Sequence, residues 1–145
     1  MTNKFGILLI PVEPKKEHIE VLYNLLKERI HNISHKKLPE FNEHKLFVLN
    51  HPYRKWFLVK SNNIYIGSIY ILENNCMGIN INSDDLDVIK KCIQCILSSV
   101  KPLPGIKSLR NENFNVNISP DNKKMCKLLN ELNAKLIEHT YIIKQ

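Results

Sequence analysis

The segment from Trp56 to Asn82 reads WFLVKSNNIYIGSIYILENNCMGININ, and it decides the fold that we expect. It holds three apolar runs, residues 56–60, 64–72 and 76–82, which the polar triplets SNN and ENN separate. In the last run, apolar residues alternate with Gly and Asn, which is the period of a half-buried strand. Consecutive strands joined by such short turns pair antiparallel. The segment therefore predicts a three-stranded antiparallel meander.

One strand and two helices are expected before the meander. Residues 5–13 form an apolar run that prolines end, so they predict a first strand. From residue 16 to about residue 30, apolar side chains recur every three or four residues, which is the pattern of an amphipathic helix. A polar, basic loop is expected at 31–39. Residues 40–50 predict a second, shorter helix. It ends before Pro52, because the residue before a proline disfavours helical backbone.

After the meander the sequence predicts a helix, a strand, a helix and a closing strand. A Ser-Asp-Asp cluster opens the first of these helices, over residues 83–99. Residues 114–118 alternate as a strand, and a Ser-Pro pair then opens a helix that Asn133 ends in the left-handed conformation. Residues 136–143 are the expected closing strand. Because a strand–helix–strand connection gives a parallel pair, we expect an α/β fold with a mixed sheet, in the order β-α-α-β-β-β-α-β-α-β.

Length, composition and charge are those of one soluble domain. The 145 residues, 43% of them hydrophobic, suffice for one core, so residues 1–145 are expected to form a single domain. The formal net charge of +7 suits an anionic partner: nucleic acid, a membrane surface or a phosphorylated small molecule. The lysines are scattered in pairs without a stacking motif, so nucleic-acid binding is not expected. With no targeting signal and no apolar run of membrane-spanning length, we expect a cytoplasmic protein without a membrane partner.

The chain has four cysteines, Cys76, Cys92, Cys95 and Cys126. Cys92 and Cys95 have the CxxC spacing, but they fall in an apolar helical pattern with no second pair and no His at ligand spacing nearby. A disulfide framework is not expected without a secretory signal. Packing in the core is the favoured interpretation, redox or metal chemistry is the alternative, and no metal site is expected.

Beyond the order of elements, six segments carry a family likeness. They are YRKWFLVK (53–60), IYIGSIY (64–70), MGINI (77–81), FNVNISPDN (114–122), LNAKL (132–136) and TY (140–141). The first three are similar to strands two to four of the GNAT superfamily of acyl-coenzyme A-dependent N-acetyltransferases. The last three are similar to that family's fifth strand, its helix opening and its closing segment. The resemblance covers about residues 5–143, which is most of the chain.

The resemblance implies a site for acetyl-coenzyme A between strands four and five, which part from each other in this family. Backbone groups of strand four bond the pantetheine arm there as an added strand would, and in this sequence they belong to Ile79, Asn80 and Ile81. Asn117 flanks the same cleft from strand five. Asn122 and Lys123, at the start of the last helix, are further expected cofactor contacts. Helix capping by Asn122 and a merely solvated Lys123 remain the alternatives.

The activity that the resemblance implies is direct transfer of acetyl to a primary amine of a small molecule, by a monomer or a homodimer. The segment around His44 is loosely similar to members that acetylate amino-sugar nucleotides, so an amino sugar is the first acceptor class to consider. The expected catalytic residues are Glu73 and Tyr141. The expected acceptor contacts are His31, Asn32, His35, His44 and Tyr70. Glu73 as an exposed turn carboxylate, and His35 and His44 as solvated surface histidines, are the alternatives.

Two departures from the family pattern favour a different function. The stretch NSDDLDVI, residues 82–89, stands where the family has its glycine-rich phosphate turn, and it contains no glycine. Its three aspartates satisfy the helix dipole themselves and repel a diphosphate. Leu129 stands where many members carry a Tyr that protonates the leaving thiolate. The alternative function is therefore a non-catalytic GNAT-like binding module that has lost normal coenzyme A binding.

Overall fold

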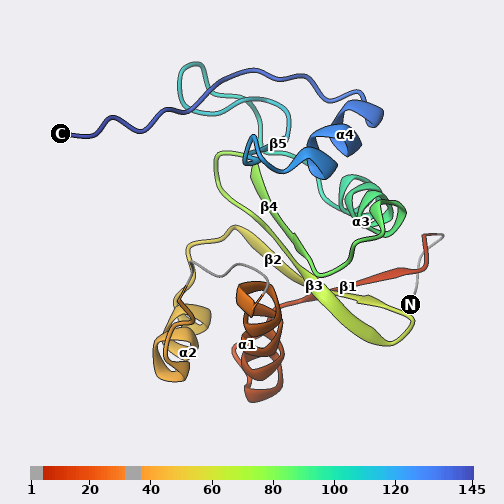
Figure 1. Ribbon diagram of the computed structural model, residues 1–145, viewed down its shortest axis with the longest axis vertical. Helices are drawn as coiled ribbons and strands as arrows, with labels where there is room; N and C mark the ends of the chain where they lie inside the picture. Colours follow the sequence, from red (N-terminus) through yellow and green to blue (C-terminus); the bar gives the residue numbers. More distant parts are fainter. Residues whose placement is uncertain (1–4, 32–36) are drawn as a thin grey trace.

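A computed structural model describes residues 5–31 and 37–145, with the backbone alone at residues 30 and 31. Its order of elements matches the expected one up to the last helix (Figure 1). The elements are β1 (Ile7–Pro11), α1 (Lys16–His31), α2 (Phe41–Leu49), β2 (Lys55–Ser61), β3 (Ile64–Ile71), β4 (Cys76–Ile81), α3 (Leu86–Ser99), β5 (Asn115–Val116) and α4 (Lys123–Glu131).

The strands form one mixed sheet in the order β1-β2-β3-β4-β5. Each pair from β1 to β4 is antiparallel, and β5 joins β4 in parallel after the crossover through α3. Asparagines make the turns: Asn62 and Asn63 have φ of 51° and 65° between β2 and β3, and Asn75 has φ of 68° before β4. Asn tolerates this left-handed region better than most residues. The predicted meander is therefore confirmed, and the triplets SNN and ENN are its turns.

Helices cover both faces of the sheet (Figure 1). Leu58 and Val59 are neighbours on β2 that point to opposite faces, and both are fully buried. Leu58 packs with apolar residues of α1 and α2. Val59 packs with α3 and with the inward residues of the other strands, and α4 in turn packs on α3. The mixed α/β architecture is therefore two helical layers around one sheet.

The CxxC pair lies in the core between α3 and the sheet. Cys92 and Cys95 are 0% and 1% exposed, and burial raises the pKa of the Cys92 thiol to about 12. A thiol with that pKa is protonated at neutral pH, so it is a poor nucleophile and ligand. The predicted core packing is confirmed. Within residues 5–31 and 37–145, no group of His, Cys, Asp or Glu side chains could hold a metal ion, and no helix has the length and apolar character to cross a bilayer.

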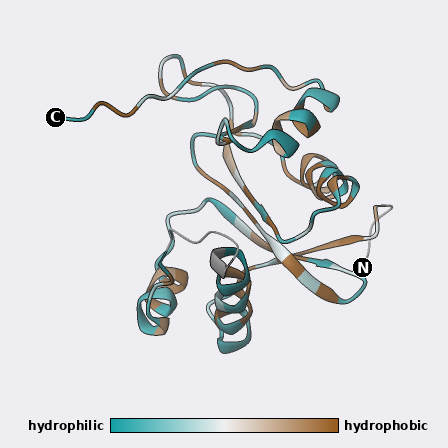
Figure 2. Ribbon diagram, viewed as in Figure 1, coloured by the Kyte–Doolittle hydropathy of each residue, from teal (hydrophilic) through white to brown (hydrophobic). Residues whose placement is uncertain are grey.

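The prediction of a closing strand at 136–143 is wrong. After α4 ends, Asn133 takes the left-handed conformation that the sequence predicts, with φ of 61°, and the Ala134 N–H bonds the Leu129 carbonyl. The chain then runs outward without pairing to any described strand, and Tyr141 is 81% exposed. Figure 2 shows hydrophobic residues along this extended segment. A strand needs a partner edge as well as apolar residues. The sequence pattern indicates apolar residues and does not indicate whether an edge is available.

Candidate functional site

The edge of β4 that faces β5 is largely unpaired. The Asn82 N–H bonds the Ile66 carbonyl at 2.7 Å, and the Leu72 N–H bonds the Cys76 carbonyl at 2.9 Å. Antiparallel ladders bond every second residue to a given neighbour, so these two bonds set the alternation for the whole of β4. By this alternation Asn80 bonds β3, whereas Ile79 and Ile81 direct their N–H and C=O groups to the other side.

No described strand takes up the groups that Ile79 and Ile81 direct outward. β5 pairs with β4 only at Cys76 and Met77. The side chains of Ile79 and Ile81 pack between the sheet, α3 and α4, which fixes the position of the edge. The structure therefore presents the backbone of two of the three expected cofactor contacts. The backbone of Asn80 belongs to the β3 ladder, so only its side chain is left for a ligand.

The start of α3 is occupied by the protein's own carboxylates. The Asp87 N–H donates to the Asp85 side chain at 2.9 Å, which makes Asp85 the helix cap. Asp84 pairs with Lys124 at 3.8 Å and Asp87 with Lys91 at 3.1 Å. Carboxylates at a helix N-terminus take the place that an anionic ligand would use. The predicted acidic start of this helix is confirmed by the Asp85 cap, and carboxylates in this place do not suit a diphosphate.

The residues expected to contact the cofactor from β5 and α4 have mainly structural contacts. Asn122 caps α4, because its side-chain oxygen accepts from the Met125 N–H at 3.2 Å. The Asn117 side-chain amide lies 3.5 Å from the Cys76 sulfur, which places it beside the start of β4. Lys123 is exposed at the first turn of α4. Asn117 thus lies beside the part of β4 that β5 pairs with.

Tyr70 lies on the face of the sheet that α1 and α2 cover. The outer end of its ring, with the hydroxyl, lies across Gly78 of β4, and a Cβ at Gly78 would collide with it. Tyr53 stacks on the Tyr70 ring with 4.1 Å between centroids and 8° between planes. Sequence reasoning identified Tyr70 and missed Tyr53, although the segment YRKW contains it. Its ring contact is with a residue 17 positions away, which no local sequence pattern indicates.

His44 is buried rather than exposed, which contradicts the surface alternative. Its Nε2 lies 2.9 Å from the Ile19 carbonyl, and its ring contacts the ring of Tyr23 at 5.1 Å. Burial lowers the pKa of this histidine, and the bond to the Ile19 carbonyl opposes the shift. His44 therefore ties α2 to α1. Asn32, His35 and the side chain of His31 lie outside the described residues.

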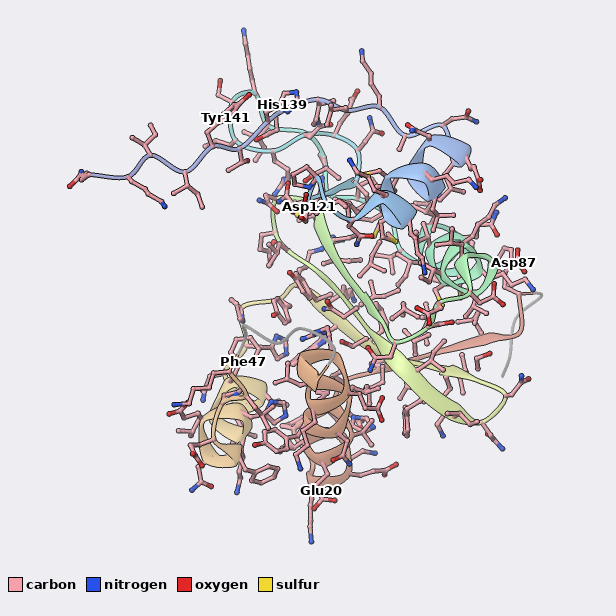
Figure 3. All side chains as sticks on the ribbon, viewed as in Figure 1. Glu20, Phe47, Asp87, Asp121, His139 and Tyr141 are labelled. Carbon is pink, nitrogen blue, oxygen red and sulfur yellow. The ribbon has the colours of Figure 1, made fainter. Side chains whose placement is uncertain are left out.

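The two expected catalytic residues are not brought together. Glu73 is exposed in the turn before β4, and its backbone carbonyl accepts from Arg110 Nη1 at 3.2 Å. Tyr141 stands on the extended C-terminal segment, where its ring contacts His139 at 6.3 Å (Figure 3). A cavity of about 460 Å³ opens elsewhere, between β1, β2 and the end of α3. Arg54, Lys55 and Lys101 line it, and none of the expected site residues does.

No model of a known protein family matches this chain. No curated protein matches its sequence either.

Proposed function

We propose that this chain is an N-acyltransferase of the GNAT type, with acetyl-coenzyme A as co-substrate and a small-molecule amine as acceptor. The observation that carries the proposal is the unpaired edge of β4 at Ile79 and Ile81. A row of N–H and C=O groups held at fixed spacing by core side chains accepts an extended ligand in the way a sheet edge accepts a strand. The β-α-α-β-β-β-α-β-α order, up to the last helix, supports the same proposal.

The residues of this chain fit one part of the cofactor and not the other. Ile79 and Ile81 suit an amide-bearing arm, because such an arm offers donors and acceptors at strand-like spacing. The carboxylate of Asp85 at the start of α3 does not suit the diphosphate. Acetyl-coenzyme A, when bound, supplies a thioester whose acetyl group an amine can take. We therefore expect an affinity that comes from the arm.

Tyr70 is the side chain that we assign to the reacting end of the edge. Its hydroxyl lies over Gly78, which directly precedes Ile79 on β4. A phenol in that position can hold or donate a proton at Oη, which acyl transfer requires on the leaving side. Glu73 and Tyr141 do not share this position. The Tyr70 hydroxyl thus replaces them as the proposed proton-carrying group.

The test separates the arm from the head of the cofactor. Calorimetric titrations with acetyl-coenzyme A, S-acetylpantetheine and adenosine 3′,5′-bisphosphate should show binding of the first two with affinities within about tenfold of each other, and none of the third. Ile79→Pro removes an N–H that faces away from β3 and should abolish binding, because proline keeps strand backbone but cannot donate. Ile79→Ala is the matched control, since it loses the same side chain and keeps the N–H. Failure of both arm-bearing ligands to bind the unaltered protein would overturn the proposal.

A binding module without catalysis is the second candidate, and the cap at Asp85 favours it. Asp85→Ser keeps a capping oxygen and removes the charge. If the start of α3 still borders the diphosphate, this change should tighten acetyl-coenzyme A binding by about tenfold and leave S-acetylpantetheine unchanged. Binding of neither ligand by either protein would leave the binding module as the function to pursue.

A further inference from the structure

The cavity of about 460 Å³ beside β1 has no part in the proposed function. Its walls come from β1, from β2 with the residue that precedes it, and from the end of α3 with the two residues that follow. β1 is the edge strand opposite β5, and β3 separates β2 from β4, so the cavity lies across the sheet from the free edge of β4. Its volume is in the range of pockets that enclose small molecules.

The charged side chains that line this cavity are all cations. They are Arg54, Lys55 and Lys101, and the described residues of the lining include no Asp or Glu. None of the ion pairs in the described part of the chain involves any of the three. The undescribed segments, 1–4 and 32–36, contain no acidic residue either. A cleft lined by one sign of charge concentrates ions of the opposite sign, so this cavity attracts anions.

Arg54 is the cation that the fold holds in place. Its Nη2 donates to the Lys101 carbonyl at 3.1 Å, and its backbone N–H donates to the Ile71 carbonyl at 2.8 Å. The residue is half-buried, and its Nε is shielded from solvent without an acceptor among the described residues. A partly buried guanidinium with unfilled donors and no counter-ion is costly. Its planar fork is the group that recognises a carboxylate or a phosphate.

The end of α3 does not cancel this positive charge. Unbonded carbonyls at a helix C-terminus amount to about −0.5 of an elementary charge, against three cations in the cavity lining. Several of these carbonyls are also bonded within the chain. The Cys95 carbonyl accepts from the hydroxyls of Ser98 and Ser99 at 3.0 and 2.7 Å, and the Ile96 carbonyl accepts from the Val100 N–H at 2.9 Å. The cations therefore dominate the field.

Apolar side chains form another part of the lining. Leu9 of β1, Phe57 of β2 and Val100 after α3 border the cavity, and all three pack against the core between α3 and the sheet. Each is only half-buried. A ligand with an apolar body would remove their remaining surface from water. The cavity thus suits an organic anion better than an inorganic one.

We infer that this cavity binds a small organic anion with an apolar body. The carboxylate or phosphate of the ligand accepts hydrogen bonds from Arg54 and Lys101, and Lys55 adds to the field. The apolar body of the ligand lies on Leu9 and Phe57. The inference is independent of the proposed function, because the cavity lining contains no residue of β4.

The test uses benzoate and phenyl phosphate as probes, with benzamide as the uncharged analogue of benzoate. Each is titrated at constant ionic strength into ¹⁵N-labelled protein and followed by NMR. The chain has three arginines, so the Nε–H signal of Arg54 can be assigned and followed by itself. A saturable shift of this signal and of the Phe57 and Val100 amides is expected with at least one anion, and none with benzamide. Saturation by only one of the two anions identifies the head group.

Two variants and a matched control test the role of the cations. Arg54→Gln should weaken binding by about tenfold or more, as the loss of charged hydrogen bonds does. Lys101→Gln keeps the backbone carbonyl that Arg54 bonds and should weaken binding by a few-fold. Arg110 donates to the Pro104 and Glu73 carbonyls at 2.7 and 3.2 Å and does not line the cavity. Arg110→Gln therefore removes the same charge and the same kind of bonds, and it should leave the affinity unchanged.

The inference is overturned if neither anion saturates the shifts at about 50 mM, or if benzamide binds as tightly as benzoate. Equal affinities of Arg54→Gln, Lys101→Gln and Arg110→Gln would overturn it as well. Anion binding that depends on Arg54, in a protein that fails to bind S-acetylpantetheine, would support this site and refute only the proposed transferase.

Discussion

Replacing Gly78 by alanine should displace Tyr70 and unstack it from Tyr53. In the folded chain the outer end of the Tyr70 ring, from Cε2 to the hydroxyl, lies where a Cβ on Gly78 would stand. The distances from that Cβ to the ring atoms would be shorter than Cβ contacts in real proteins, so the ring must rotate away. The obstacle is a side chain and not a backbone atom, which means that β4 itself can stay in register with β3. The perturbation therefore acts on the aromatic stack rather than on the sheet.

The expected cost is about 1–2 kcal/mol of unfolding free energy. Overpacking of this kind costs about 1–3 kcal/mol, and an aromatic pair with stacked geometry accounts for about 0.5–1.5 kcal/mol of it. Alanine restricts the unfolded chain relative to glycine, which returns about 0.4–1 kcal/mol at a position with ordinary strand backbone. Gly78 is such a position, because its φ lies outside the left-handed range. The clash should therefore outweigh the entropic gain.

A double-mutant cycle isolates this effect. Urea unfolding of the unaltered protein, Gly78→Ala, Tyr70→Ala and the double variant should give a coupling of at least about 1 kcal/mol. In the Tyr70→Ala background the alanine at 78 meets no ring and should be neutral or slightly stabilising. An equal cost of Gly78→Ala with and without the tyrosine would refute the placement of the Tyr70 ring over β4.

Three further predictions concern stability. Deleting residues 135–145 should change the unfolding free energy by less than about 0.5 kcal/mol in urea titrations, because their side chains are exposed; a larger loss would mean that the segment packs on the body. Asn75→Asp should lower the unfolding free energy by about 2–4 kcal/mol. The fully buried side-chain amide of Asn75 donates to two carbonyls of the loop before β5, and an ionised carboxylate cannot donate. Asn75→Gly, which keeps the backbone conformation, is the control and should cost less. Burial lowers the pKa of His18 and of His44, and His18 Nδ1 accepts a hydrogen bond from the Glu13 N–H at 2.9 Å. On acidification the unfolded state therefore takes up protons before the folded state does. The unfolding free energy should fall as the pH drops below about 6.5. Urea titrations from pH 8 to pH 5 should show this loss, with a smaller slope for His18→Gln, and a gain in stability on acidification would contradict it.

The sequence by itself determined the features that depend on neighbours along the chain. Alternation of period two and the asparagines at the turns predicted the meander, and the positive φ of Asn62 and Asn63 supplies the physical reason. The acidic start of α3 and the left-handed end of α4 at Asn133 were equally local, because a cap bonds backbone groups within a few residues. The burial of the CxxC pair followed from helical periodicity. These interactions are complete within one element and its flanks.

Tertiary structure decided whatever needed a partner from another element. The segment 136–143 has the composition of a strand, yet pairing requires an open edge in the right place, and composition does not report one. The burial of His44 depends on the carbonyl of Ile19 on another helix. The stack of Tyr53 on Tyr70 joins the segment before β2 to β3. Such contacts depend on how elements pack, because hydrogen-bond partners and counter-ions distant in sequence are chosen by the fold and leave no local pattern.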